Sequence, residues 1–151
     1  MSVLGDEGIR DLLRQAWEES SPGSATAHEE GGFVLKAADG SLTGERWPKG
    51  LQNEIGVPPH PGGKWNGLVI VATFHTHPNT GPDYLQGPSP TDVLAVRHDP
   101  ELGHAEYEGE YVISAAAVYL VRRDGTVQNV GPTETVLGSA GSPKRSETGG
   151  P

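Results

Sequence analysis

The sequence predicts a single α/β (α+β) domain in which a mixed central β-sheet is flanked by helices. Three features predict this class: an amphipathic segment near the N-terminus, a long apolar strand at 68–77, and short strand-like runs at 110–131. A chain of 151 residues is long enough for one hydrophobic core. We place the domain at residues 1–131 and expect residues 132–151, rich in Ser, Gly and Pro, to form a disordered tail.

Residues 6–20 are expected to form the first helix. Acidic residues stand at its start, where the positive end of the helix dipole favours them. Apolar residues recur at helical spacing on one face. These are Ile9, Leu12, Leu13, Ala16 and Trp17. The stretch "SSPGS" at 20–24 predicts the end of the helix.

The next part of the chain predicts two short extended segments and a long loop. Residues 31–37, "GGFVLKA", read as a strand, and the turn-forming residues after them lead to a second extended piece. Residues 45–67 contain several prolines and show no clear period. We expect a long ordered loop or insertion there, which in a compact domain is usually functional or flexible.

The second half of the chain is expected to supply the centre of the sheet. Residues 68–77, "LVIVATFHTH", begin with the continuous apolar run typical of a strand buried on both faces. Residues 89–99 predict a short helix, with Ser89 as N-cap and a proline in its first turn. Residues 110–131 predict strands joined by a hairpin turn at Asp124-Gly125.

Composition excludes several classes of function. The net charge of −9 argues against nucleic acid and anionic membrane surfaces as partners, and it suits a basic partner. The chain has no cysteine, which removes disulfide scaffolds, Cys-rich zinc modules and thiol nucleophiles. The N-terminus lacks the pattern of a secretory signal, and no apolar run reaches the ~20 residues of a membrane span. We therefore expect a cytoplasmic protein.

Two of the six histidines, His75 and His77, stand at the end of the predicted central strand. Residues i and i+2 of a strand point to the same face, so both imidazoles can hold one metal ion. Asp92, in the first turn of the following helix, is expected to supply an oxygen ligand. Two histidines, one carboxylate and one water make the open tetrahedral zinc site that hydrolases use.

Such a site also needs a base that takes the proton of the water. Glu29 and Glu30 stand directly before a predicted strand, and either carboxylate is a candidate. Each signal also has a structural explanation: most His-x-His pairs bind no metal, Asp92 can simply complete a helix cap, and the two glutamates can form a solvated turn.

Taken together, "EEGG" at 29–32, "HTHP" at 75–78 and "SPTD" at 89–92 resemble the motifs of the JAMM (MPN+) zinc metalloproteases. The resemblance covers roughly residues 25–131 and implies a cytidine-deaminase-like fold with one zinc ion per chain. It implies that His75, His77 and Asp92 bind the zinc. It also implies that Glu29 is the general acid/base, because only Glu29 stands three residues before Gly32. Ser89 would help to hold the zinc water and the developing oxyanion.

The spacing between the second histidine and the serine departs from the family pattern. Eleven residues, 78–88, separate His77 from Ser89, where family members usually have about seven. The longer loop contains Tyr84 and Leu85, which are candidate substrate-binding residues. A surface excursion without substrate contact is the alternative.

The resemblance implies a zinc isopeptidase or peptidase, similar to bacterial deubiquitinase-like enzymes that cut after the Gly-Gly end of a ubiquitin-like modifier. Alternatives within the family are a peptidase domain of a toxin or phage-tail-like system and a catalytically silent MPN binding scaffold. Outside it, a cupin-like Fe(II) site fits poorly, because Thr80 and Gly81 stand where a glutamate ligand is needed. A serine hydrolase is set aside, because no Gly-x-Ser-x-Gly motif occurs on a strand-turn-helix.

Overall fold

The computed structural model describes residues 2–81 and 84–138. The α-helices in this part of the chain are α1 (Glu7–Glu19), α2 (Pro90–His98) and α3 (Thr133–Leu137), with short 3₁₀ turns at Val3–Gly5, Pro61–Gly63 and Pro100–Leu102. The strands are β1 (Gly31–Lys36), β2 (Leu42–Arg46), β3 (Lys64–Trp65), β4 (Leu68–Thr76), β5 (Glu110–Ile113), β6 (Ala117–Val121) and β7 (Val127–Pro132).

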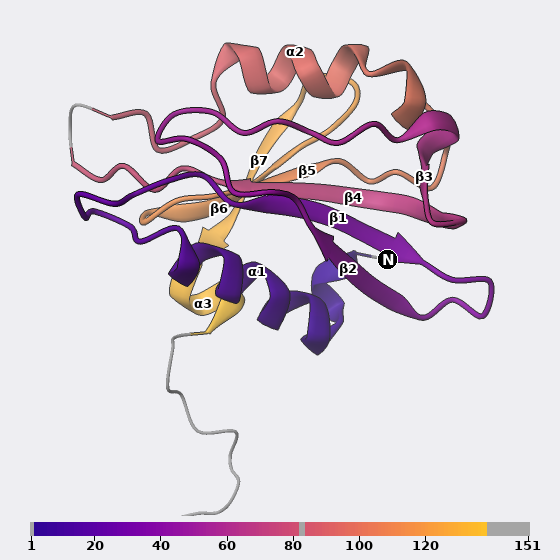
Figure 1. Ribbon diagram of the computed structural model, residues 1–151, viewed down its shortest axis with the longest axis horizontal. Helices are drawn as coiled ribbons and strands as arrows, with labels where there is room; N and C mark the ends of the chain where they lie inside the picture. The colour runs from indigo at the N-terminus through magenta and orange to yellow at the C-terminus, as the bar shows by residue number, and fades with distance from the viewer. Residues whose placement is uncertain (1, 82–83, 139–151) are drawn as a thin grey trace, which may run out of the picture.

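The strands form one mixed seven-stranded sheet in the order β2-β1-β4-β5-β6-β7, with β3 paired to β4 beside this path. Helix α2 lies over one face of the sheet, and α1 and α3 lie over the other (Figure 1). The predicted class, a mixed central sheet flanked by helices, is therefore confirmed.

The first helix forms where the apolar stripe predicts it. Asp6 caps α1 by accepting a hydrogen bond from the Ile9 N–H at 3.1 Å. Ile9, Leu13 and Ala16 are buried against the sheet, whereas Leu12 and Trp17 are partly buried. The helix ends at Glu19, and Ser20 forms its C-cap.

Strand β4 is the central strand that its apolar sequence predicts. It pairs antiparallel with β1 and parallel with β5, and residues 70–76 are all buried. A parallel pair needs a crossover connection, and α2 lies in the segment that links β4 to β5. The N-terminus of α2 is thereby brought back to the end of β4.

Each face of the sheet has its own core. Val34, Phe74 and Ile113 belong to the cluster under α1 and α3. Phe33 and Val112 belong to the cluster on the α2 face. Because side chains alternate along a strand, the odd-numbered residues at the end of β4 point to the α2 face, where β5 presents its even-numbered residues.

The segment expected as a loop at 45–67 is largely irregular, but β2 reaches Arg46 and β3 occupies Lys64–Trp65. Trp47 is buried at 3% exposure and packs edge-on against Phe33, with ring centroids 5.3 Å apart. A Cβ on Gly31 would lie 2.6 Å from the Trp47 ring, so this contact requires glycine at the start of β1.

The predicted start of the tail at Pro132 is too early. Strand β7 continues to Pro132, and α3 follows with Thr133 and Leu137 buried. Leu137 packs into the core under α1, which gives this short segment an apolar contact that its composition does not reveal. The rest of the expected tail, 139–151, lies outside the described residues. Nowhere in the described chain is a helix long and apolar enough for a membrane crossing.

Candidate metal centre

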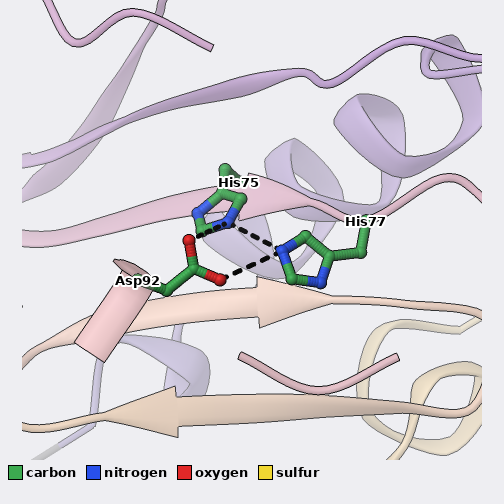
Figure 2. A group of neighbouring side chains, drawn as sticks. All are labelled: His75, His77 and Asp92. Carbon is green, nitrogen blue, oxygen red and sulfur yellow. Dashed lines mark hydrogen bonds and ion pairs between the residues drawn. The ribbon is translucent and has the colours of Figure 1, made fainter. Parts of the chain in front are cut away.

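His75, His77 and Asp92 converge on one point at the end of β4 (Figure 2). The two Nε2 atoms of the histidines are 3.2 Å apart. Asp92 Oδ1 lies 3.4 Å from His75 Nε2, and Asp92 Oδ2 lies 3.1 Å from His77 Nε2. This group can hold a metal ion.

The spacing of the two histidine nitrogens suits a small tetrahedral ion. Zinc binds His nitrogen and carboxylate oxygen at about 2.0–2.2 Å, so neighbouring ligand atoms of a regular tetrahedron are about 3.3 Å apart. The 3.2 Å between the two histidine Nε2 atoms is close to this value, and each of these nitrogens has one Asp92 oxygen at 3.1 or 3.4 Å. Three protein ligands also leave one tetrahedral position open, as catalytic zinc sites require.

The local sequence explains why these side chains meet. His75 lies within β4 and His77 directly after it, on the same side of the chain. Asp92 is the third residue of α2, and a capping box with Ser89 holds it. The Asp92 N–H donates to Ser89 Oγ at 3.0 Å, and the Ser89 N–H donates to Asp92 Oδ2 at 2.8 Å.

The electrostatics of the group favour a bound cation. Burial opposes ionisation of Asp92, but hydrogen bonds from His75 and His77 outweigh it and hold the Asp92 pKa below its ordinary value. Burial lowers the pKa of His75, but the carboxylates of Glu110 and Asp92 outweigh it and raise that pKa well above the ordinary value. A metal ion that binds here therefore replaces a proton among closely spaced ligands.

The structure separates the two candidate bases. Glu29 lines the same cleft as the three candidate ligands and is 7% exposed. Burial raises its pKa to about 7, although the nearby histidines pull it down. The Glu30 carboxylate instead forms an ion pair with Arg46, at 2.6 Å, and a hydrogen bond with His28 Nε2, at 2.5 Å.

Ser89 and the loop residues Tyr84 and Leu85 also line this cleft, which has a volume of about 530 Å³. One wall comes from the long loop after β2, including Ile55 and Val57, and the other from the loop after β4. Tyr84 is 47% exposed and Leu85 58% exposed, so both offer apolar surface at the cleft. All the predicted site residues thus lie around one cavity.

Glu110, the first residue of β5, also lines the cleft, although no motif in the sequence predicts it. Its carboxylate Oε2 accepts a hydrogen bond from His75 Nδ1. Glu106, Glu108 and Glu110 alternate along the chain before β5, and their spacing alone does not distinguish them. The parallel pairing of β4 with β5 would have been the necessary signal.

Comparison of the chain with protein-family models, with curated proteins and with solved structures finds no match in any of the three. The geometry of the site and the motifs of the sequence therefore carry the functional argument.

Proposed function

We propose that the protein is a zinc-dependent peptidase or isopeptidase of the JAMM (MPN+) type, with the cytidine-deaminase-like fold of that family. The observation that carries the proposal is the convergence of His75, His77 and Asp92, whose ligand atoms lie within 4.8 Å of one another, in a cleft that Glu29 also lines. Two histidines, one carboxylate and a free carboxylate beside them are the groups that hydrolysis by an activated water requires.

The reaction is the addition of water to an amide carbonyl, followed by cleavage of the C–N bond. His75, His77 and Asp92 would hold a zinc ion, which would supply Lewis acidity and would lower the pKa of a bound water from 15.7 to about 7. Glu29 accepts a proton from the attacking water and delivers it to the leaving amine. A carboxylate with a pKa near neutral suits both transfers.

Ser89 is suited to stabilise the developing oxyanion. Its Oγ accepts the hydrogen bond from the Asp92 N–H, which leaves the hydroxyl proton free to donate towards the cleft. A donor aimed at the site where negative charge develops typically contributes about 10²–10³ in rate.

The substrate in this proposal is an extended protein tail, such as the Gly-Gly end of a ubiquitin-like modifier joined to a second chain. Among the described residues that line the cleft, the acidic side chains are Glu29, Glu54, Asp92 and Glu110, with no lysine or arginine. This lining suits a tail that carries basic residues. The exposed apolar side chains of Val57, Tyr84 and Leu85 offer contacts for its larger residues.

The first experiment measures zinc per chain by elemental mass spectrometry in the wild type, His77→Ala and His98→Ala. His98 lies exposed in the last turn of α2 and serves as the matched control. We expect about one zinc in the wild type and in His98→Ala, and almost none in His77→Ala. A well-folded wild type that takes up no zinc from added metal refutes the metal centre.

The second experiment incubates the zinc-loaded protein with a ubiquitin-like domain fused through Gly-Gly to a reporter, and with the same fusion carrying Ala-Ala. We expect cleavage after Gly-Gly and much slower cleavage of the Ala-Ala fusion, because only glycine lets the chain pass closely beside other groups. A loaded protein that cuts neither fusion nor any other peptide indicates a silent binding scaffold instead.

A further inference from the structure

Glu110 accepts a hydrogen bond from Nδ1 of His75, the ring nitrogen that points away from the other candidate metal ligands. His75 Nδ1 donates to Glu110 Oε2, while the other ring nitrogen, Nε2, faces His77 and Asp92. The two nitrogens of an imidazole lie on different edges of the ring. A partner fixed on Nδ1 therefore determines which nitrogen presents a lone pair to an ion.

The sheet register places Glu110 where it can do this. Strands β4 and β5 are parallel, with Thr73 opposite Glu110 and His75 opposite Val112. Thr73, His75 and Glu110 consequently point to the α2 face of the sheet. The Glu110 side chain is 15% exposed and that of His75 is 6% exposed, so little water competes for their hydrogen bond.

Further hydrogen bonds fix the Glu110 carboxylate itself. Thr73 Oγ1 donates to Glu110 Oε1 at 3.0 Å. Because the only hydroxyl proton of Thr73 is used in that bond, the buried contact of 2.7 Å between Thr73 Oγ1 and the Tyr107 hydroxyl has tyrosine as the donor. The chain Tyr107–Thr73–Glu110–His75 thus runs from the core to the metal centre.

We propose that Glu110 is a positioning residue that holds His75 with its proton on Nδ1 and its Nε2 lone pair directed at the metal ion. The inference rests on the metal centre of the proposed function and adds a residue to it. Carboxylates in this position orient the ligand ring and raise its basicity, and their loss typically costs about 10–100-fold in metal affinity or activity. His77 offers an internal contrast, because its buried Nδ1 has no hydrogen-bond partner among the described residues.

A simpler role for Glu110 is structural, as the first residue of β5. Four substitutions separate the two roles. Glu110→Ala removes the acceptor and the charge, whereas Glu110→Gln keeps an acceptor for His75 Nδ1–H. Thr73→Val removes the donor that fixes the carboxylate. Glu108→Gln is the matched control, because Glu108 is bound to Tyr111 and the Val3 N–H and not to the metal centre.

The test measures zinc affinity of the full chain by competition with a chromophoric chelator, together with the visible absorption spectrum of the Co²⁺-substituted protein. The spectrum reports ligand geometry, which a merely structural role would leave unchanged. Melting curves of the metal-free variants show whether each is folded. We expect Glu110→Ala to weaken zinc binding about 10–100-fold and to alter the Co²⁺ spectrum. Glu110→Gln and Thr73→Val should lose less zinc affinity than Glu110→Ala. Glu108→Gln should match the wild type in zinc affinity and in the Co²⁺ spectrum.

Wild-type affinity and an unchanged Co²⁺ spectrum in folded Glu110→Ala would overturn the inference. If Glu110→Ala does not fold, wild-type affinity together with an unchanged spectrum in both Glu110→Gln and Thr73→Val overturns it. Equal losses of zinc affinity in Glu110→Ala and Glu110→Gln, without a change in the Co²⁺ spectrum, would also overturn the inference. Glu110 would then act on zinc binding through its negative charge alone and not by orienting His75. A wild type that binds neither metal refutes the metal centre itself, which is a different result.

Discussion

Ser89 and Asp92 hold each other through two backbone-to-side-chain hydrogen bonds of 3.0 and 2.8 Å at the start of α2. This capping box stabilises the helix, and it also turns the Asp92 carboxylate towards His75 and His77. A single local motif therefore connects the stability of α2 with the geometry of the candidate metal centre.

Ser89→Ala is expected to reduce stability modestly and catalysis strongly. The variant loses the acceptor for the Asp92 N–H, which costs about 0.5–2 kcal/mol in the free energy of unfolding. The bond from the Ser89 N–H to Asp92 Oδ2 remains, so zinc content should stay near one per chain. Loss of the hydroxyl donor should lower kcat by about 10²–10³.

Asp6→Ala is the control for that variant, because Asp6 caps α1 far along the chain from the cleft. Asp6→Ala should lose a similar amount of unfolding free energy, measured by urea denaturation, while its kcat stays at the wild-type value. A Ser89→Ala variant with unchanged kcat would show that Ser89 only caps the helix.

Glu29→Gln should keep zinc and lose most of the activity. The amide cannot accept the proton of water, and a well-placed base contributes about 10²–10⁴ in rate. Glu30→Gln is the matched comparison, since Glu30 is bound to Arg46 and His28 instead. It should be less stable but retain its activity per folded molecule, measured by peptide cleavage at equal zinc content. The reverse ranking of the two variants would assign the base to Glu30.

Burial of Glu29 makes the stability of the metal-free protein depend on pH. Its pKa is raised to about 7 in the folded state from 4.5, so the folded protein binds more protons between these values. The Glu29 contribution to stability is therefore greatest below pH 4.5 and is lost as pH rises through 7. A shift of this size corresponds to about 3 kcal/mol at most.

Glu29→Gln should accordingly gain stability relative to the wild type as pH rises from about 4.5 to 8. Urea unfolding in the presence of a chelator measures this difference at each pH. A difference that does not change with pH contradicts the assigned pKa.

Zinc should stabilise the protein by mass action. Free zinc at 100 times its Kd adds about 2.7 kcal/mol to the free energy of unfolding, which raises Tm by several degrees in a domain of this size. Differential scanning calorimetry with and without a chelator should show this shift in the wild type and His98→Ala. His77→Ala should show almost none. An equal shift in His77→Ala would place the ion elsewhere.

Tyr84 and Leu85 should affect substrate binding more than stability. Both side chains are about half exposed at the cleft, so the double substitution Tyr84→Ser/Leu85→Ser removes little buried surface. We expect KM for a Gly-Gly fusion to rise severalfold while Tm stays within a degree or two. Leu94→Ser, on the exposed side of α2, is the control. An unchanged KM in the double variant would indicate that this loop does not contact the substrate.

Local sequence was sufficient to predict the main elements and the candidate ligand pair His75 and His77. Residues close together in the sequence predict the apolar stripe of α1, the apolar run of β4 and the Ser89 cap of α2. This works because helix caps and hydrophobic periodicity are short-range effects. The pairing of His75 with His77 is also predicted locally, because strand geometry places the side chains of residues i and i+2 on one face.

Long-range contacts decided the rest. Composition marked the chain after residue 131 as a tail, but Leu137 finds an apolar contact in the core beneath α1. The spacing to Gly32 favours Glu29 over its neighbour Glu30, but only the position of Arg46 shows the physical difference, because Arg46 binds the Glu30 carboxylate.

The sequence by itself determined the α/β class, the elements that carry the site, and the residues His75, His77 and Asp92. The elements follow from interactions among residues a few positions apart, and the three candidate ligands follow from the order of the motifs at 75–78 and 89–92. Only the tertiary structure brought Asp92 back to the end of β4, paired Glu30 with Arg46, and placed Glu110 against His75. These relationships depend on the parallel register of β4 and β5 and on side-chain packing between distant segments, which no local pattern encodes.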